Sequence, residues 1–323
     1  MRALAALTAA AALHLPPGYH AHVYASGLHH PTAMAFRPHG LLYVTQDDGS
    51  VVVVRPRSRS PRTVMRGLPV TLGLVWLGRS RLVVSAAGRL VLASVSRNGS
   101  VTGTRAIVSR LPYKLHQQDN VVYRRGWLYL GSGSTCNACV ERDRRSAAVL
   151  AVRPNGSGLR VVARGLRNPY GLVVEPRTGR ILVSVNGRDD VDRRGDPEPA
   201  EMVVELRHGR NYGWPACWPS ARLLRLVGRC RGVTPPLAYL EPHSAPAGMA
   251  FWRGKLYVAE WGEYNGHRFG RRVVRVRLEG PQQQRVSVFA SGFSHPLALA
   301  VEPGGRALLV SDWGRGVIYR ITR

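Results

Sequence analysis

Short apolar segments alternate with turns along the whole chain. Runs of roughly four to eight residues rich in Val, Leu and Tyr are bounded by Gly, Pro, Asp and Arg, a pattern typical of β-strands joined by tight turns. Apolar residues at helical spacing are nearly absent, and we find no amphipathic stretch of about ten or more residues. The pattern therefore predicts an all-β protein.

The strands fall into six repeats. The clearest repeats open with Gly-Leu or Gly-Phe and a Pro-bearing turn, continue through an apolar strand and a second strand such as "LLYV", and end with a third strand and usually a fourth. The repeats begin at Ser26, Arg66, Ser109, Arg164, His243 and Ser291. Four strands in a unit of roughly 40–50 residues are the signature of a propeller blade, so we predict a six-bladed β-propeller.

The two ends of the chain complement each other. The sixth repeat stops after three strands at Arg323, while "YHAHVYASGL" from Tyr19 resembles "RVSVFASGF", which supplies the fourth strand of the fifth repeat. We therefore expect the N-terminal strand to complete the last blade, which hides sheet edges that would otherwise invite aggregation. Residues 15–323 are predicted to form this single domain.

Residues 1–14 and the cysteines suggest export. One Arg precedes the apolar run from Ala3 to Leu13, which resembles a short or truncated signal peptide; the alternative is an apolar tail behind a misplaced start site. Zinc-ribbon spacing and a thioredoxin-like βαβ context are both missing around the cysteines. We therefore predict a periplasmic or extracellular protein with two local disulfides, Cys136 with Cys139 and Cys217 with Cys230.

The formal net charge of +27 comes almost entirely from arginines scattered singly along the 323 residues. Because nucleic-acid grooves are usually met by a clustered stripe of charge, we expect no specific nucleic-acid partner, only non-specific attraction to anionic surfaces at low salt. No run of about 20 apolar residues is present, so no membrane span is expected.

Polar residues precede the first strand of each repeat, in turns that meet at one mouth of a propeller channel. The alternative is a set of ordinary polar turns in which histidines cap strands. The residues are His29, His30, Thr71, His116, Gln117, Gln118, Asp119, Asn120, Arg167, Asn168, His243, Ser244 and His295.

Three segments carry a resemblance to a known family. "LHQQDNVVYRRGWLYLGSGS", "GLRNPYGLVVEP" and "SVNGRDD" with the later "PAEMVVELRHGRNYGWP" resemble the glucose/sorbosone dehydrogenase family, with the sorbosone-type branch closer, over residues 15–323. Soluble members are six-bladed propellers that use pyrroloquinoline quinone (PQQ). The resemblance implies an oxidoreductase that oxidises a sugar or sugar aldehyde with PQQ and Ca²⁺. Val140 follows Cys139, so no C-x-x-C-H haem site is present and a separate cytochrome or quinone is expected to accept the electrons.

The resemblance also implies roles for single residues. His116 matches the family's base, which takes the hydroxyl proton, and Arg167 and Asn168 match residues that receive the carboxylates of the cofactor. Arg271 or Arg272 stands nearest the family's blade-five lysine, and His295 stands where an arginine pair precedes the last blade.

The same comparison implies metal ligands. Gly187 and Arg188 match positions whose backbone carbonyls bind the Ca²⁺ at the cofactor. Glu201 and Tyr212 fall on the family's metal-loop segment, where they either support a second, structural Ca²⁺ or tie down a long loop.

Two other functions stay open at this point. A Ca²⁺-dependent lactonase or other hydrolase would need carboxylates from different repeats to meet on one ion. A non-catalytic propeller that binds carbohydrate or protein would carry aromatic residues on its rims. The candidate carboxylates are Asp119, Glu241, Glu260 and Asp312, and the candidate aromatics are Trp214, Trp218, Trp252, Trp261 and Trp313.

Overall fold

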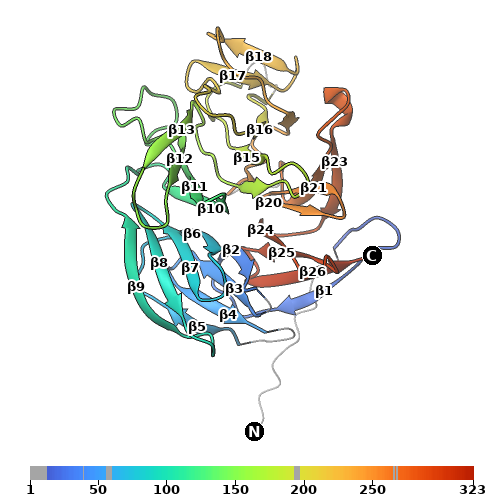
Figure 1. The fold of residues 1–323 in the computed structure, drawn as a ribbon. Coiled ribbons are helices and arrows are strands. Elements are labelled where there is room, and N and C mark those ends of the chain that lie inside the picture. Colours follow the sequence, from blue (N-terminus) through green and yellow to red (C-terminus); the bar gives the residue numbers. More distant parts are fainter. Residues whose placement is uncertain (1–12, 39, 56–59, 193–196, 265, 267) are drawn as a thin grey trace.

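The computed structural model describes residues 13–38, 40–55, 60–192, 197–264, 266 and 268–323. In these residues the strands form six antiparallel sheets of four strands each, arranged as blades around a central axis (Figure 1). The only helical element described is the single 3₁₀ turn η1 (Gln282–Gln284). The predicted six-bladed β-propeller is confirmed.

The first three blades follow one another without interruption in strand order. Their strands are β2 (Pro31–Phe36), β3 (Leu42–Gln46), β4 (Val51–Val54) and β5 (Arg62–Met65) in blade one; β6 (Thr71–Trp76), β7 (Arg81–Ala86), β8 (Arg89–Val95) and β9 (Val101–Val108) in blade two; and β10 (Gln118–Arg124), β11 (Trp127–Ser132), β12 (Ala148–Val152) and β13 (Arg160–Arg164) in blade three.

Blade four carries an additional hairpin, and blade six takes its fourth strand from the other end of the chain. The strands are β14 (Leu172–Val174), β15 (Ile181–Val185), β16 (Glu201–Glu205) and β19 (Ala238–Leu240) in blade four, with β17 (Cys217–Ser220) and β18 (Arg225–Gly228) as the hairpin; β20 (Pro246–Trp252), β21 (Lys255–Glu260), β22 (Arg272–Val276) and β23 (Val286–Ser291) in blade five; and β24 (Pro296–Val301), β25 (Leu308–Asp312), β26 (Val317–Thr322) and β1 (His20–Ala25) in blade six.

The ring is closed by the pairing of β1 with β26. The two strands run antiparallel, with His20 opposite Thr322 and Val23 opposite Tyr319. The predicted completion of the last blade by the N-terminal strand is therefore confirmed. Closure removes an exposed sheet edge at the point where the chain begins and ends.

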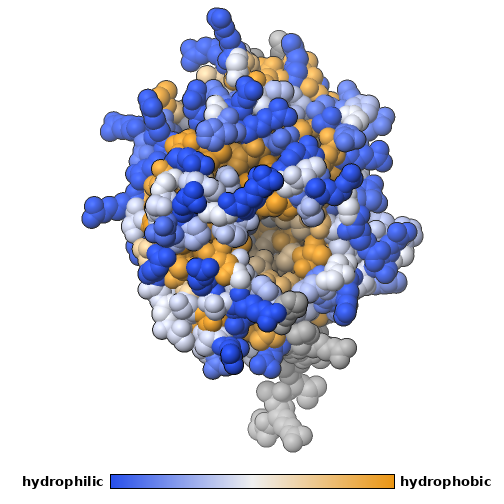
Figure 2. Space-filling model, viewed as in Figure 1, coloured by the Kyte–Doolittle hydropathy of each residue, from blue (hydrophilic) through white to orange (hydrophobic). Residues whose placement is uncertain are grey.

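Apolar side chains fill the space between neighbouring blades. Each of the six interfaces around the ring holds its own buried cluster, and the one between blades six and one contains Tyr24, Leu42 and Ile318. Because blades pack face to face, the middle strands are buried on both faces, as in β3 and β12. This explains the continuous Val- and Leu-rich runs of the sequence. Figure 2 shows a hollow near the centre of the ring and hydrophilic residues dispersed around it.

The predicted disulfides are both present. Cys136 is bonded to Cys139 in the segment between β11 and β12, and Cys217 is bonded to Cys230 across the β17–β18 hairpin. Both bonds close short segments at the blade-three and blade-four side of the ring.

The segment that resembles a signal peptide, residues 1–14, lies largely outside the described residues. The backbone of His14 pairs with Ser291 through two hydrogen bonds of 3.0 and 3.1 Å, so this residue is attached to blade five. No helix in the described part of the chain is long and apolar enough to cross a membrane.

Ring closure predicts a face-specific effect on stability along β1. Tyr24 is buried between the last and first blades, while its neighbour Val23 is 36% exposed. We expect Tyr24→Ala to lower the free energy of unfolding by about 3 kcal/mol or more, because it leaves a large cavity. Val23→Ala is the matched control and should change it by about 0.5 kcal/mol or less. Urea unfolding measures both, and equal effects would contradict the packing role of β1.

Candidate functional site

A cavity of about 720 Å³ opens at one mouth of the channel. All six blades contribute to it. Blade four supplies Arg167, Asn168, Asn186 and Glu201. The other blades are represented by Asp47 (blade one), Leu72 (two), His116 (three), His243 (five) and Trp313 (six). Its floor is an apolar cluster that includes Leu72 and Leu297. The size and the mixed lining are typical of a small-molecule site.

The structure brings only some of the predicted mouth residues to this cavity. His116, Gln117, Arg167, Asn168 and His243 line it. The other members of the predicted ring are not among the lining residues. Asp119, for instance, is buried beneath the mouth, where burial holds its carboxyl pKa well above the usual range.

His116 is held by Ser134. The Nδ1 atom of the imidazole lies 3.1 Å from the Ser134 hydroxyl oxygen, and that hydroxyl donates its own hydrogen to the Cys136 carbonyl at 2.7 Å. Since the serine hydrogen is already used, the serine oxygen accepts and Nδ1 donates. The neutral ring therefore keeps the lone pair on Nε2, the atom a base would use.

Burial, and to a smaller extent the nearby charge of Arg167, lower the pKa of His116 to about 4, although a backbone hydrogen bond with Ser134 acts in the opposite direction. The imidazole is therefore neutral at pH 7 and ready to accept a proton. An unfolded histidine takes up its proton near pH 6.5. The folded state consequently loses stability as pH falls from about 6.5 to about 4.

Arg167 and Asn168 lie side by side at the end of the blade-three to blade-four connection. Arg167 is buried, and its Nη2 donates to the Asp189 carboxylate at 2.6 Å. The backbone of Asn168 forms a bridge with Asn186, which fixes the start of blade four against the end of β15. The pair is thus a rigid part of the cavity wall.

The disulfide-closed segment 136–139 positions this wall. The Asn137 carbonyl accepts from Arg167 Nε at 3.2 Å and from Trp214 Nε1 at 2.9 Å, and the Asn137 side-chain oxygen accepts from the Asp189 amide at 3.1 Å. Sequence reasoning missed Asn137. The C-x-x-C pattern marked the turn, but its contacts depend on a loop folding back from blade three.

Gly133 allows the side chains of His116 and Asn168 to pack closely. A Cβ atom built on Gly133 would lie 2.3 Å from the Cβ of His116 and 2.9 Å from the side-chain oxygen of Asn168. Only a glycine leaves room for both neighbours at this position. Gly133 was also missed, since glycines in turns are common and nothing in the sequence marks this one.

Glu201 is the most deeply buried carboxylate of the cavity wall. Its carboxylate accepts from the Gly187 amide, and burial raises its pKa to about 8. Gly187 and Arg188 are not among the lining residues, and the Arg188 side chain turns to Asp190 and the Pro215 carbonyl. Tyr212 lies in the apolar cluster between blades three and four, where its hydroxyl donates to the Glu205 carbonyl.

A family model described as glucose/sorbosone dehydrogenase matches residues 150–320, more than half of the chain. The chain belongs to the glucose/sorbosone dehydrogenase family. The resemblance seen in the sequence is therefore confirmed at the level of the family.

Solved structures agree with the fold. The calcium structure of a Trichoderma reesei carbohydrate-active enzyme of family AA12 has a TM-score of 0.85 at 18% identity, over 98% of each chain. The holo form of the PQQ domain of pyranose dehydrogenase from Coprinopsis cinerea has a TM-score of 0.83 at 20% identity, over 97% of each chain. At these identities the likeness establishes a shared fold.

Curated relatives are matched over part of their length. An aldose sugar dehydrogenase of Escherichia coli K12 is 24% identical over 121 residues, which are 33% of this chain and 30% of that protein. A second curated relative, from Borreliella burgdorferi, is 22% identical over 218 residues, which are 60% of this chain and 56% of that protein. The chain therefore matches only part of the length of both relatives.

Three residues that the sequence analysis predicted to bind the cofactor, Arg271, Arg272 and His295, do not line the cavity. Arg272 is paired with Glu241 at 2.9 Å and with the buried Glu260 at 2.6 Å. Arg271 Nη2 donates to the Glu263 carbonyl at 3.2 Å, and a ring nitrogen of His295 lies 3.2 Å from the same oxygen. Glu263 lines the cavity, whereas these three residues do not.

Aromatic residues form the wall between blades five and six. Trp261 packs edge-on against Trp313 at 5.6 Å and against Tyr264 at 4.7 Å between ring centres, and all three line the cavity. The prediction that Trp252 lies on a rim is wrong. It is 1% exposed, between blades five and six, because its indole nitrogen is satisfied by the Gly305 carbonyl and its ring fills the core.

The four carboxylates of the hydrolase alternative do not meet. Glu241 and Glu260 share Arg272, while Asp312 accepts from the Ser294 amide at 2.8 Å and the His295 amide at 2.9 Å. Within the described residues, none of them belongs to a group of three or more potential metal ligands. A calcium-dependent hydrolase built on these residues is therefore not supported.

The close packing at Gly133 can be tested by adding one methyl group. We expect Gly133→Ala to lower the free energy of unfolding by about 1–3 kcal/mol, because the segment after β11 must move away from His116, and to shift the His116 ring signals in NMR spectra. Gly103→Ala, on β9, is the control, since no described atom lies within 4 Å of a Cβ built there. Equal stability of the two variants would contradict the steric role of Gly133.

The charge of Arg167 close to His116 predicts that removal of this arginine changes the pKa of the imidazole. In Arg167→Gln the pKa of His116 should rise above about 4, because a positive charge that repels the imidazolium is removed; it should remain below 6.5, because burial is the larger cause. NMR titration of the ring protons measures it. Arg153→Gln, in which an arginine stacked on Trp127 is replaced, should leave the pKa unchanged.

Proposed function

We propose that this protein is a PQQ-dependent dehydrogenase that oxidises a sugar or a sugar aldehyde, with Ca²⁺ as a second cofactor. Membership of the glucose/sorbosone dehydrogenase family supports the reaction class. The observation that carries the proposal is that His116, with its Nδ1 atom held by Ser134, lines the same cavity as Arg167 and Asn168.

Buried polar atoms of the cavity wall fit a ligand of this kind. Among the described residues, the side-chain oxygens of Asn168 and Asn186 and the Tyr170 hydroxyl are buried without a hydrogen-bond partner. Such groups are costly to bury unless something satisfies them. All three residues line the cavity, so a bound cofactor and its ion would meet them there.

The oxygen atoms on the blade-four side suit Ca²⁺. Asn168 and Asn186 offer unpartnered carbonyl oxygens, and Asp189 and Glu201 offer carboxylates. Hard oxygen donors of this kind are the ligands that Ca²⁺ prefers. Gly187 and Arg188 follow Asn186 directly, and we propose their backbone carbonyls as further ligands. The second, structural Ca²⁺ at Glu201 and Tyr212 stays a prediction; Tyr212 lies in an apolar cluster, where its hydroxyl donates to the Glu205 carbonyl.

The cationic side of the wall suits an anionic, planar cofactor. We propose that Arg167 and the Asn168 amide receive its carboxylates, as charge-assisted bonds favour. Arg271 and His295 act through the Glu263 carbonyl and position the blade-five wall, and Arg272 forms ion pairs with Glu241 and Glu260. PQQ, if bound, would supply a two-electron acceptor for the hydride.

His116 is the proposed base for the substrate. Its Nε2 takes the proton of the hydroxyl on the carbon being oxidised, so that the C–H electron pair can leave as hydride and a carbonyl forms. The hydrogen bond from Nδ1 to Ser134 keeps the ring in the required tautomer. Electrons then leave to a separate cytochrome or quinone. The two disulfides favour export, because such bonds persist in oxidising compartments.

Reconstitution tests this function. Protein supplied with PQQ and Ca²⁺ should reduce an artificial dye when given aldoses, and His116→Ala should lower the rate by about 100-fold or more, because general-base catalysis contributes roughly that much. His208→Ala, at an exposed turn, is the control and should keep full activity. PQQ binding, followed by its absorption spectrum, should survive in both variants.

Two results would overturn the proposal. One is the failure of wild-type protein to bind PQQ or to reduce dye with any sugar tested. The other is tight sugar binding without turnover that is unchanged in His116→Ala, which would indicate a non-catalytic, carbohydrate-binding propeller.

A further inference from the structure

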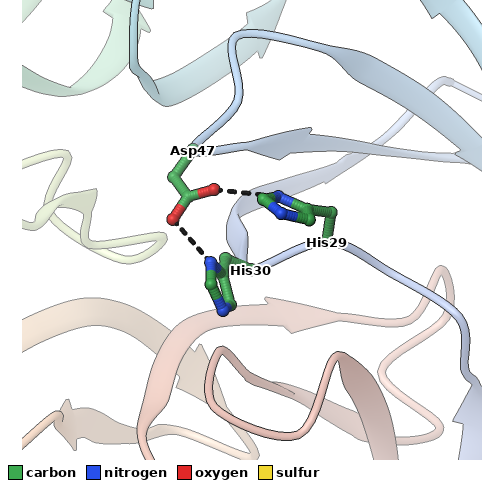
Figure 3. A group of neighbouring side chains, drawn as sticks. All are labelled: His29, His30 and Asp47. Carbon is green, nitrogen blue, oxygen red and sulfur yellow. Dashed lines mark hydrogen bonds and ion pairs between the residues drawn. The ribbon is translucent and has the colours of Figure 1, made fainter.

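Two histidines and one aspartate form a compact group at the blade-one side of the mouth (Figure 3). His29 and His30 lie in the turn before β2, and Asp47 follows β3. The Nδ1 atom of His29 is 3.1 Å from one carboxylate oxygen of Asp47, and the Nδ1 atom of His30 is 2.9 Å from the other. The proposed sugar oxidation uses none of these three side chains.

The donor atoms match those of a transition-metal site. Two imidazole nitrogens and one carboxylate oxygen are the ligands that Zn²⁺ and related divalent ions prefer. In a tetrahedral site with bonds of about 2.0–2.1 Å, neighbouring ligand atoms are roughly 3.3 Å apart. The spacings of 3.1 and 2.9 Å join the two histidine nitrogens to different oxygens of Asp47, and one ligand atom from each of the three residues lies within 4.8 Å of the others, close enough for a single ion to be held.

Contacts outside the group hold each ligand in place. The Asp47 amide donates to the His30 carbonyl at 3.2 Å, and the His29 amide donates to the side chain of Gln46 at 2.8 Å. The His30 ring stacks on Trp313, with ring centres 3.9 Å apart and planes inclined by 17°. Supporting contacts of this kind orient the side chains that bind the metal and reduce the entropy lost on binding.

Stability alone gives little reason for the arrangement. The side chains of His29, His30 and Asp47 are 61%, 39% and 26% exposed, and ion pairs at such positions contribute about 0–1 kcal/mol. His30 also adopts a positive φ of 45°, a conformation that is uncommon outside glycine. An arrangement that is ordered, conformationally costly and weakly stabilising is better explained by a ligand.

We propose that His29, His30 and Asp47 bind a divalent transition-metal ion of the Zn²⁺ class at the mouth of the channel. Three protein ligands leave a fourth position open in a tetrahedral site. Asp47 also lines the cavity, so the open position is available to water or to an oxygen of a molecule entering there. The site is independent of PQQ and of the proposed sugar oxidation.

Isothermal titration calorimetry of the full-length, metal-stripped protein with Zn²⁺ tests the site. Excess Ca²⁺ in the buffer is included to fill the proposed Ca²⁺ site on the blade-four side, so that Zn²⁺ does not bind there. We expect one Zn²⁺ per chain, and an affinity at least about 100-fold lower in His30→Ala and in Asp47→Asn, because losing a ligand costs more than the 10–100-fold of losing a supporting partner. Co²⁺ should give the strong visible absorption of a tetrahedral site in wild-type protein but not in His30→Ala or Asp47→Asn.

The control variant removes one member of another pair of exposed histidines. His20 and His22 alternate on the exposed part of β1, so their side chains share one face and could bind an ion themselves. His22→Ala should keep the wild-type affinity. Thermal melts of the metal-free variants should match wild type, because the replaced side chains are exposed or half-buried. Unchanged Zn²⁺ affinity in His30→Ala or Asp47→Asn, or its loss in His22→Ala, would overturn the proposal.

Discussion

The packing of each blade against the next is the constraint on which the whole structure depends. No blade can bury both faces of its sheet alone, so each of the six apolar interfaces stabilises two neighbours at once. The interface between blades six and one includes Tyr24 and Ala25 of β1, which is held in blade six by its pairing with β26. Closing the ring brings the turns before the first strands to a common mouth. Residues from Asp47 to Trp313 therefore share one cavity, although they are far apart in the chain.

Within that cavity, the neutral base His116 lies close to the cation Arg167, and the two do not form an ion pair. Arg167 lowers the tendency of His116 to take up a proton, while Asp189 and the Asn137 carbonyl hold the guanidinium in place. The short segment closed by the Cys136–Cys139 disulfide connects both, since Cys136 orients Ser134 and Asn137 holds Arg167. An anionic ligand bound at Arg167 would relieve the repulsion and raise the pKa of His116, which would make the imidazole a stronger base when the ligand is present.

The fold was predictable because every blade repeats the same order of strands and turns, and because the N-terminal strand still resembles the strand whose place it takes. Grouping His116 with Arg167 and Asn168 followed from motifs in the same way. Contacts made through backbone atoms were not predictable, as Asn137 and Gly133 illustrate, since neither side-chain type nor spacing marks them. Side-chain partners set by strand register were missed too. Arg272 is opposed by Glu260 across β21 and β22 and is neutralised there, and Trp252 turns into the core.

The mouth of the channel separates two kinds of ligand chemistry. In a ring of six blades, blades one and four are three positions apart, on opposite sides of the axis (Figure 1). Blade four presents amide and carboxylate oxygens, which favour a hard ion such as Ca²⁺, whereas blade one presents two imidazoles with a single carboxylate, which favour a transition metal. With a net charge of +27, the protein offers no general attraction for cations. Ion binding on either side would therefore depend on directed ligands, and the donor atoms of the two sides favour different ions.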